Sequence, residues 1–229
     1  MHYVISDIHG EHKRFFAMLK TIKFRKKDKL YIIGDIPSRG VGTFEILDWV
    51  MTQTNVIHIK GNHELFLQKY LEQDVAMLMN YSKFGGNPVI NALQSMFEER
   101  KANYCMYLSQ LPLYHVITIN EDEYILTHSG FMADQEPIYR EDGTIDLIAS
   151  IHKWGKAFEY QYLISSDLHF IPASNKLPKL IVGHYPTFHL GCDGIYIGKR
   201  YIDIDNGVNT IPNKKLACLR LEDMKEYYI

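Results

Sequence analysis

Short apolar runs alternate with helix-like segments over roughly the first quarter of the chain. Tyr3–Ile5, Leu30–Ile33 and Val56–Ile59 are β-favouring runs, each ended by small or polar residues. The segments between them place apolar side chains on one helical face: Phe15, Phe16, Leu19 and Ile22, then Phe44, Leu47 and Met51. These strand–loop–helix units predict a sheet with helices on its faces.

The middle of the chain, from about 64 to 110, has a helical pattern. Asn87 and Pro88 suit the N-cap and the first position of a helix. An apolar stripe at helical spacing follows them: Val89, Ile90, Leu93, Met96 and Phe97. We expect a helical excursion here, near whatever site the strands carry, and the stretch Phe84–Asn87 is a candidate to line a substrate cleft.

Beyond Pro112 the pattern becomes β-like. The later runs are 114–119, 124–127, 179–182, 196–197, 201–204 and 215–221. They predict a second, largely antiparallel or mixed sheet, and no repeat or linker divides the chain. The expected fold is therefore one α/β domain over residues 1–229, with two packed mixed sheets flanked by helices.

Composition narrows the classes of protein. The 229 residues are 46% hydrophobic with a formal net charge of −2, which suits a soluble globular domain and predicts no general nucleic-acid-binding surface. The three cysteines lack CxxC spacing, so we expect buried free thiols. No signal peptide or membrane-spanning run is seen, and the cytoplasm is the expected location. The sequence does not indicate an oligomeric state.

Polar residues of the metal-binding types follow the apolar runs. They are Asp7, His9, Asp35, Asn62, His63, His128 and His184, within the motifs "DIHG", "GDIPSRG", "GNHE", "THSG" and "GHYP". Any one of them could be a helix cap or an ordinary histidine. Together they lie where open α/β sheets bind ligands, beyond the carboxyl ends of strands.

Oxygen and imidazole ligands without thiolate suit Mn, Fe or Zn. Two such ions sharing a carboxylate would activate a water and hold a phosphoryl group for in-line attack. A dinuclear metal hydrolase needs such a ligand set.

The ordered motifs resemble the calcineurin-like metallophosphoesterases. "DIHG", "GDxxxRG", "GNHE", "HSG", a distal "GH" and the closing "YIDIDNGV" are most similar to the phosphoprotein phosphatase branch, which includes bacterial protein phosphatases and symmetrical diadenosine tetraphosphatases. The resemblance covers nearly the whole chain. It implies an α/β/β/α sandwich and two divalent or trivalent metal ions.

The resemblance also implies residue roles. Asp7 and His9 bind the first metal and Asp35 bridges both. His63 is the general acid or holds the substrate, with Asn62 beside it, and Arg39 binds the phosphate through its planar guanidinium. The second metal is completed by Asn62, His128 and His184.

Two departures from the family pattern matter. Many members have Asp before the arginine, where this chain has Ser38, and a serine cannot stabilise an imidazolium by charge; we therefore expect a lower pKa for His63 than in those members, unless another carboxylate substitutes. Phosphoprotein phosphatases also tend to supply a second arginine after the "HGG" motif, where only Lys153 and Lys156 are found.

The leading interpretation is a serine/threonine protein phosphatase-like enzyme, with a phosphorylated protein as substrate. The alternative is a hydrolase of dinucleoside polyphosphates such as diadenosine tetraphosphate. A nuclease or cyclic-nucleotide phosphodiesterase is disfavoured because there is no basic tract. Ser38 motivates one alternative from another class, a catalytically weak metal-containing module that binds phosphoproteins or nucleotides.

Overall fold

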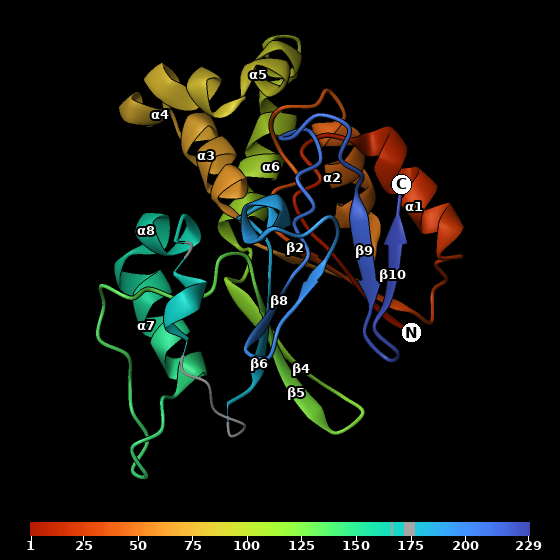
Figure 1. The fold of residues 1–229 in the computed structure, drawn as a ribbon. Helices are drawn as coiled ribbons and strands as arrows, with labels where there is room; N and C mark the ends of the chain where they lie inside the picture. Colours follow the sequence, from red (N-terminus) through yellow and green to blue (C-terminus); the bar gives the residue numbers. More distant parts are fainter. Residues whose placement is uncertain (166, 172–176) are drawn as a thin grey trace.

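The first sheet carries the N-terminal strands. The computed structural model describes residues 1–229 except 166 and 172–176 (Figure 1). The strand order is β10-β9-β1-β2-β3, in which β1, β2 and β3 are parallel and β9 and β10 are antiparallel additions. Their bounds are β1 His2–Ile5, β2 Lys29–Ile33, β3 Val56–Ile59, β9 Ala217–Arg220 and β10 Lys225–Tyr228.

The second sheet is also mixed and has the order β4-β5-β6-β8-β7. Strands β5, β6 and β8 are parallel, and β4 and β7 pair with them in the antiparallel sense at the two edges. The bounds are β4 Tyr114–Ile119, β5 Asp122–Thr127, β6 Lys179–Val182, β7 Tyr196–Ile197 and β8 Tyr201–Asp203.

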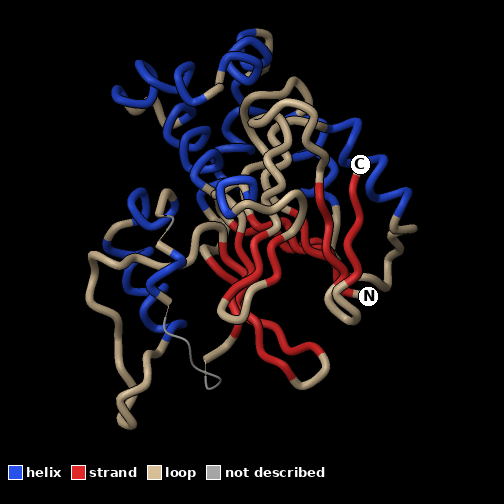
Figure 2. Tube along the Cα trace, in the orientation of Figure 1, coloured by secondary structure: helices blue, strands red, loops and turns tan. Residues whose placement is uncertain are grey.

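Helices lie outside the sheets (Figure 2). Figure 1 shows α1 and α2 on the side of β9 and β10, and α7 and α8 on the opposite side of the molecule. The helical excursion predicted for about 64–110 is present. The bounds are α1 His12–Thr21, α2 Thr43–Thr52, α3 Asn62–Leu71, α4 Val75–Asn80, η1 Tyr81–Phe84, α5 Asn87–Gln94, α6 Glu98–Ser109, α7 Leu147–Ala157, α8 Glu159–Leu163, η2 Leu168–Phe170 and η3 Thr187–Leu190.

Alternating side chains divide the core into three layers. In β1, Ile5 faces the helices α1 and α2, whereas Val4 faces the second sheet; in β2, Ile32 and Ile33 divide in the same way. A third cluster packs α7 and α8 on the outer face of the second sheet, around Trp154. The predicted α/β/β/α arrangement of two mixed sheets is therefore confirmed.

The structure corrects three details of the sequence prediction. The run 215–221, expected in the second sheet, forms β9 of the first sheet, where it pairs with β1. Helices α7 and α8 occupy a region for which the apolar pattern predicted no element. The helix predicted to begin with Asn87 as its N-cap has Gly86 there instead, so Pro88 lies one position further into the first turn.

Two expectations from composition can also be compared with the structure. The cysteines are free, as predicted, but only Cys218 is fully buried. Within the described ranges 1–165, 167–171 and 177–229, no helix has the length and apolar character needed to cross a bilayer.

Candidate metal centre

The carboxyl ends of five strands bring the predicted metal-binding residues together. β1 ends at Ile5 before Asp7 and His9, and β2 ends at Ile33 before Asp35. Three further strands supply the others: β3 leads into α3 with Asn62 and His63, β5 into His128, and β6 into His184. Because these strand ends lie at one edge of the sandwich, short loops suffice to place all the side chains at one point.

The loops hold several of these residues in the left-handed backbone region. The φ angles are 50° for Asp7, 46° for His9, 60° for Asp35, 64° for Arg39 and 71° for His184. Such angles disfavour residues other than glycine and cluster at functional sites, where the surrounding structure enforces them.

Backbone hydrogen bonds join the first two loops. The N–H of His9 donates to the carbonyl of Asp35 at 2.9 Å, and the N–H of Gly40 donates to the carbonyl of His9 at 2.9 Å. A Cβ at Gly40 would lie 2.5 Å from that carbonyl oxygen, so only glycine permits this approach. The glycine fixes the separation between His9 and Arg39.

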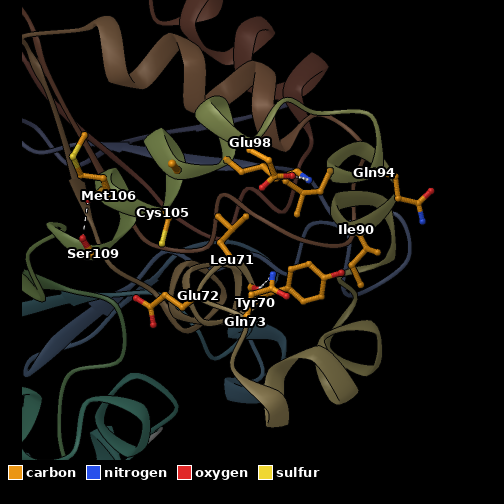
Figure 3. Close-up of a pocket in the computed structure, with 13 residues that line it drawn as sticks. Tyr70, Leu71, Glu72, Gln73, Ile90, Gln94, Glu98, Cys105, Met106 and Ser109 are labelled. Carbon is orange, nitrogen blue, oxygen red and sulfur yellow. Dashed lines mark hydrogen bonds and ion pairs between the residues drawn. The ribbon is translucent and has the colours of Figure 1, made fainter.

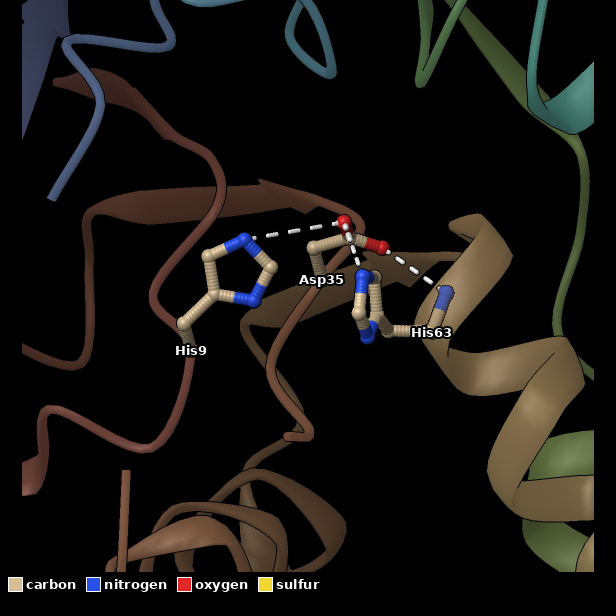
Figure 4. A group of neighbouring side chains, drawn as sticks. All are labelled: His9, Asp35 and His63. Atoms are coloured by element: carbon tan, nitrogen blue, oxygen red, sulfur yellow. Dashed lines mark hydrogen bonds and ion pairs between the residues drawn. The ribbon is translucent and has the colours of Figure 1, made fainter. Parts of the chain in front are cut away.

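Asp35 lies between two groups of histidines. Its Oδ2 is 3.9 Å from His9 Nε2 and 3.8 Å from His63 Nε2 (Figure 4). Its Oδ1 is 3.4 Å from His128 Nε2, and His184 completes that second group. The ligand atoms in each group lie within 4.8 Å of one another, so one carboxylate can serve two ions.

The other two predicted oxygen ligands lie at the same place. Asp7 Oδ1 is 3.9 Å from His9 Nε2, on the side of the first group. Asn62 Oδ1 is 2.8 Å from His128 Nε2 and 3.0 Å from His184 Nδ1, on the side of the second. All six predicted metal-binding residues therefore lie together, around Asp35 and the histidines next to it.

Backbone carbonyls orient three of the imidazoles. His128 Nδ1 donates to the carbonyl of Ile33 at 2.9 Å, and His184 Nε2 donates to that of Ile164 at 3.2 Å. His9 Nδ1 is 3.3 Å from a third carbonyl, that of Pro37. Each ring therefore turns its other nitrogen toward the acidic centre, as the outer partners of metal-binding histidines do.

The charges at this point favour a cation. Burial, followed by the charges of Asp7 and Glu64, raises the pKa of Asp35 well above its ordinary value. Burial also lowers the pKa of His9 to about 3, with Arg39 adding to the effect, and lowers that of His184 to about 4. Neutral imidazoles beside crowded, desolvated carboxylates are the form that binds a metal, so these residues fit the ions that the sequence predicts.

His63 differs from the three oriented histidines. Its Nδ1 is buried, and none of the described residues forms a hydrogen bond with it. Burial, then the charges of His9 and Arg39, lowers its pKa well below the ordinary value. Its backbone N–H donates to Asp35 Oδ1 at 3.0 Å, which fixes the start of α3 against the bridging carboxylate.

Ser38 does not contact this imidazole through a hydrogen bond. Ser38 is fully buried, and its Oγ is 3.0 Å from the hydroxyl oxygen of Tyr81. Burial raises the pKa of the Tyr81 hydroxyl, which therefore stays protonated. Ser38, at the position where many similar proteins have Asp, is thus part of a neutral hydroxyl pair. Among the described residues, no carboxylate forms a hydrogen bond with His63 Nδ1 in its place.

Arg39 faces a cavity of about 490 Å³ that also contacts Asn62 and His63. Its guanidinium donates to Thr210 Oγ1. Of the stretch Phe84–Asn87, which the sequence made a candidate cleft lining, Phe84 and Gly85 form part of the wall. The cavity therefore connects the predicted metal-binding residues with the predicted phosphate-binding arginine.

Two acidic residues of the site were given no role by the sequence. Glu64 is fully buried and accepts the N–H groups of Asp35 and Ile36, each at 2.7 Å, and that of Gly61 at 2.9 Å. Asp205 follows β8 as the other acids follow their strands, and burial and the charge of Asp7 raise its pKa. Both residues lie in motifs that the sequence already showed: Glu64 ends "GNHE", and Asp205 is the second aspartate of "DIDNG".

A larger groove of about 820 Å³ lies elsewhere, between α3, α5 and α6 (Figure 3). Tyr70, Ile90, Glu98 and Cys105 line it, and it includes none of the predicted site residues. This groove is therefore separate from the candidate metal centre, despite its larger volume.

Comparison with known proteins places the chain in a family. The family model described as calcineurin-like phosphoesterase matches residues 3–211, and the chain belongs to this family. This is the family that the ordered motifs predicted.

Two relatives carry the same name, symmetrical bis(5'-nucleosyl)-tetraphosphatase. The protein from Methylobacillus flagellatus is 29% identical over 133 residues, which are 57% of this chain and 43% of the relative. The protein from Klebsiella pneumoniae is 27% identical over 131 residues, 56% and 42% of the two chains. The match thus spans less than half the length of these relatives.

Solved structures share the fold at low identity. A putative diadenosine tetraphosphatase has a TM-score of 0.60 at 16% identity and covers 100% of this chain and 92% of its own. A cold-active protein tyrosine phosphatase from a Shewanella species has a TM-score of 0.52 at 14% identity, and the match covers 99% of this chain and 79% of that protein. A serine/threonine phosphatase from Saccharomyces cerevisiae has a TM-score of 0.51 at 18% identity, and the match covers 89% of this chain and 66% of that protein.

Proposed function

We propose that this chain hydrolyses a phosphate ester or anhydride with two metal ions, divalent or trivalent, held by Asp7, His9, Asp35, Asn62, His128 and His184. The observation that carries the proposal is the position of Asp35, with His9 and His63 at one carboxylate oxygen and His128 at the other. When bound, such ions supply a nucleophilic water at neutral pH and positive charge for the phosphoryl oxygens.

The protein's own groups orient the substrate and move the proton. Arg39 binds two oxygens of the scissile phosphate with its guanidinium. The oxygen of water bonds to phosphorus as the bond to the leaving oxygen breaks. His63, at the border of the metal site and the cavity, gives that oxygen a proton or holds the substrate for the step.

Two substrate classes are supported equally at this level. The first is a phosphorylated serine or threonine of a protein, which the sequence placed first. The second is a dinucleoside polyphosphate, the substrate class in the names of the two relatives above. The third possibility, a binding module without useful turnover, rests on Ser38.

Turnover measurements separate the enzyme from the binding module. With added Mn we expect hydrolysis of p-nitrophenyl phosphate, of a phosphoserine peptide or of diadenosine tetraphosphate. Asp35→Asn should lower the rate at least ~100-fold by removing the shared ligand. His63→Asn should lower it by roughly 100-fold or more while bound metal, measured by elemental analysis, stays constant.

His152→Asn is the matched control, because His152 is exposed on α7, and it should change neither rate nor metal content. An absence of metal-dependent turnover on all three substrates would exclude the enzyme. Loss of metal in His63→Asn would show that His63 is a ligand instead of the proton donor.

A further inference from the structure

The cavity beside Arg39 has an aromatic wall that the reaction itself does not require. Phe66, at 3% exposure, lies behind this wall, next to His63 with ring centroids 5.2 Å apart. Phe84 stacks on Phe66 at 4.7 Å, and the Tyr160 ring lies 6.1 Å from it. Phe84 and Tyr160 remain 37% and 42% exposed, so two rings stand open at the cavity.

Both exposed rings have a fixed backbone position relative to the phosphate-binding residue. On the Phe84 side, the Arg39 N–H donates to the carbonyl of Gly85 at 2.7 Å. A Cβ at Gly85, where φ is 82°, would lie 2.8 Å from Arg39 Cγ. η1 and the Arg39 loop are therefore held at a constant separation.

On the Tyr160 side, a partly buried ion pair holds α8. Lys60, whose side chain is 4% exposed, contacts Glu159 Oε1 through Nζ at 3.0 Å and donates to Gln68 Oε1 of α3 at 3.1 Å. The carbonyl of Ile164, which also lines the cavity, accepts the hydrogen bond from His184. The aromatic wall is thus anchored to the same elements that hold the metal-binding residues.

A lysine supplies positive charge in the same cavity. Lys83 precedes Phe84 on η1, is exposed, and lines the cavity with Arg39. Its Nζ donates to Asn80 Oδ1 at 2.9 Å on the surface, a contact that leaves its charge unneutralised. Lys153, one of the two lysines found where phosphoprotein phosphatases tend to supply a second arginine, instead donates to the carbonyl of Glu136 and does not line this cavity.

From this arrangement we infer that the cavity is a leaving-group subsite for a nucleoside polyphosphate: Phe84 and Tyr160 stack with the base, and Lys83 binds a phosphate beyond the scissile one. The inference rests on the proposed function for the position of the scissile phosphate. A phosphoserine residue by itself brings neither a second phosphate nor a planar ring, whereas a nucleoside polyphosphate brings both. Exposed aromatic rings beside a cation are the usual means of binding a base with its phosphates.

Kinetics on two substrates test the subsite. Diadenosine tetraphosphate carries both ring and phosphates, and inorganic tripolyphosphate carries phosphates alone. Phe84→Ala and Tyr160→Ala should each lower the ratio of kcat/KM for diadenosine tetraphosphate over that for tripolyphosphate by ~5- to 100-fold, the effect of losing one base stack. Phe84→Tyr keeps a ring and should restore the ratio.

Lys83→Ala should give a different pattern. It should lower kcat/KM for diadenosine tetraphosphate and for tripolyphosphate relative to that for p-nitrophenyl phosphate. The matched controls are Phe97→Ala, a phenylalanine that is 85% exposed outside the cavity, and Lys101→Ala, a lysine paired with Glu98 on α6. Both controls should leave all ratios unchanged.

Binding without turnover separates this inference from the proposed function. Calorimetric titration of diadenosine tetraphosphate in EDTA should give a Kd that rises at least ~5-fold in Phe84→Ala but not in Phe97→Ala. If Phe84→Ala raises this Kd but the wild-type protein hydrolyses no phosphate substrate with added Mn, the proposed function would be wrong and the subsite would stand. Unchanged ratios and an unchanged Kd, or a higher kcat/KM for the phosphoserine peptide than for the nucleotide, would overturn the subsite.

Discussion

At the scale of single residues, Glu64 organises the site without contacting the cavity. Burial alone raises its pKa, but the hydrogen bond and charge of His58 and the N–H groups of Asp35 and Ile36 outweigh burial and hold the pKa at about 2. A carboxylate that accepts several N–H groups from two metal-binding loops acts as their common anchor.

We therefore expect Glu64→Gln to destabilise the fold. The difference between about 2 and the ordinary 4.5 corresponds to roughly 3 kcal/mol of unfolding free energy near neutral pH. Because the folded pKa is the lower one, this contribution is present above about pH 4.5 and is lost as the pH falls toward 2. Urea unfolding of the wild type and of Glu64→Gln at several pH values measures it.

The control for this experiment is Glu99→Gln, since Glu99 is exposed on α6 and its substitution should change stability by less than about 0.5 kcal/mol. A stability difference between wild type and Glu64→Gln that stays constant from pH 7 to pH 3 would show that the charge of Glu64 is not the source of its contribution.

Ser38 has a different meaning in the structure from the one it had in the sequence. In the sequence, Ser38 stands where an aspartate is common, and it predicted a lower pKa for His63, the expected proton donor. The structure places it with Tyr81 of η1, the same short element that carries Lys83 and Phe84 to the cavity. The hydroxyl pair thus helps to hold η1 against the Arg39 loop.

At the scale of elements, the site depends on how closely the loops after β1 and β2 approach. The backbone bond from Gly40 to His9 allows no side chain between the two loops, because a Cβ at Gly40 would meet backbone atoms of His9 and Gly10 within 2.8 Å. Backbone cannot move aside as the end of a side chain can.

We expect Gly40→Ala to separate these loops. Unfolding free energy should fall by about 2 kcal/mol or more, which lowers the melting temperature by roughly 4–8 °C for a chain of this length. Bound Mn should fall as well, because His9 moves with its carbonyl. Thermal melting and metal analysis give the two values.

The neighbouring Val41→Ala is the control, since the Val41 side chain is 74% exposed and its loss should leave both values unchanged. Normal metal content in Gly40→Ala would mean that the loops adjust and that the close approach is not needed by the site.

At the scale of the whole molecule, the two sheets share one core layer. Val4 and Ile33 of the first sheet pack in the same cluster as Leu126, Ile181 and Ile202 of the second. The proposed metal-binding residues also come from both sheets. We therefore propose that the chain is a single domain that unfolds as one cooperative unit.

The two tryptophans provide the test, because Trp49 packs against Phe15 beside the first sheet and Trp154 against Phe131 beside the second. Trp49→Phe and Trp154→Phe leave one fluorescent reporter in each half. In each variant, the urea midpoint from fluorescence should equal the midpoint from far-ultraviolet circular dichroism. Comparing the two signals within one variant cancels any stability change from the substitution; separate midpoints would indicate two independently unfolding halves.

Local pattern predicted much of this molecule. Runs such as Leu30–Ile33 have their strand propensity in their own side chains, and the motifs that follow them contain the ligand types in order. The strand ends therefore predicted that Asp35, His128 and His184 lie at one ligand-binding edge, and the resemblance of the ordered motifs predicted the family. The segment 215–221 shows the limit: its strand was visible, but its pairing with β1 depends on contacts more than 200 positions apart along the chain.

The sequence by itself determined the chemistry available to this protein: a set of aspartate, asparagine and histidine residues at strand ends, and an arginine near them. Tertiary structure decided how that chemistry is arranged. The ring orientation of His184 depends on the carbonyl of Ile164, and the aromatic wall requires Phe84 and Tyr160 to meet across Phe66. Such contacts join residues that share no local pattern, so only the packing of the two sheets and their helices determines them.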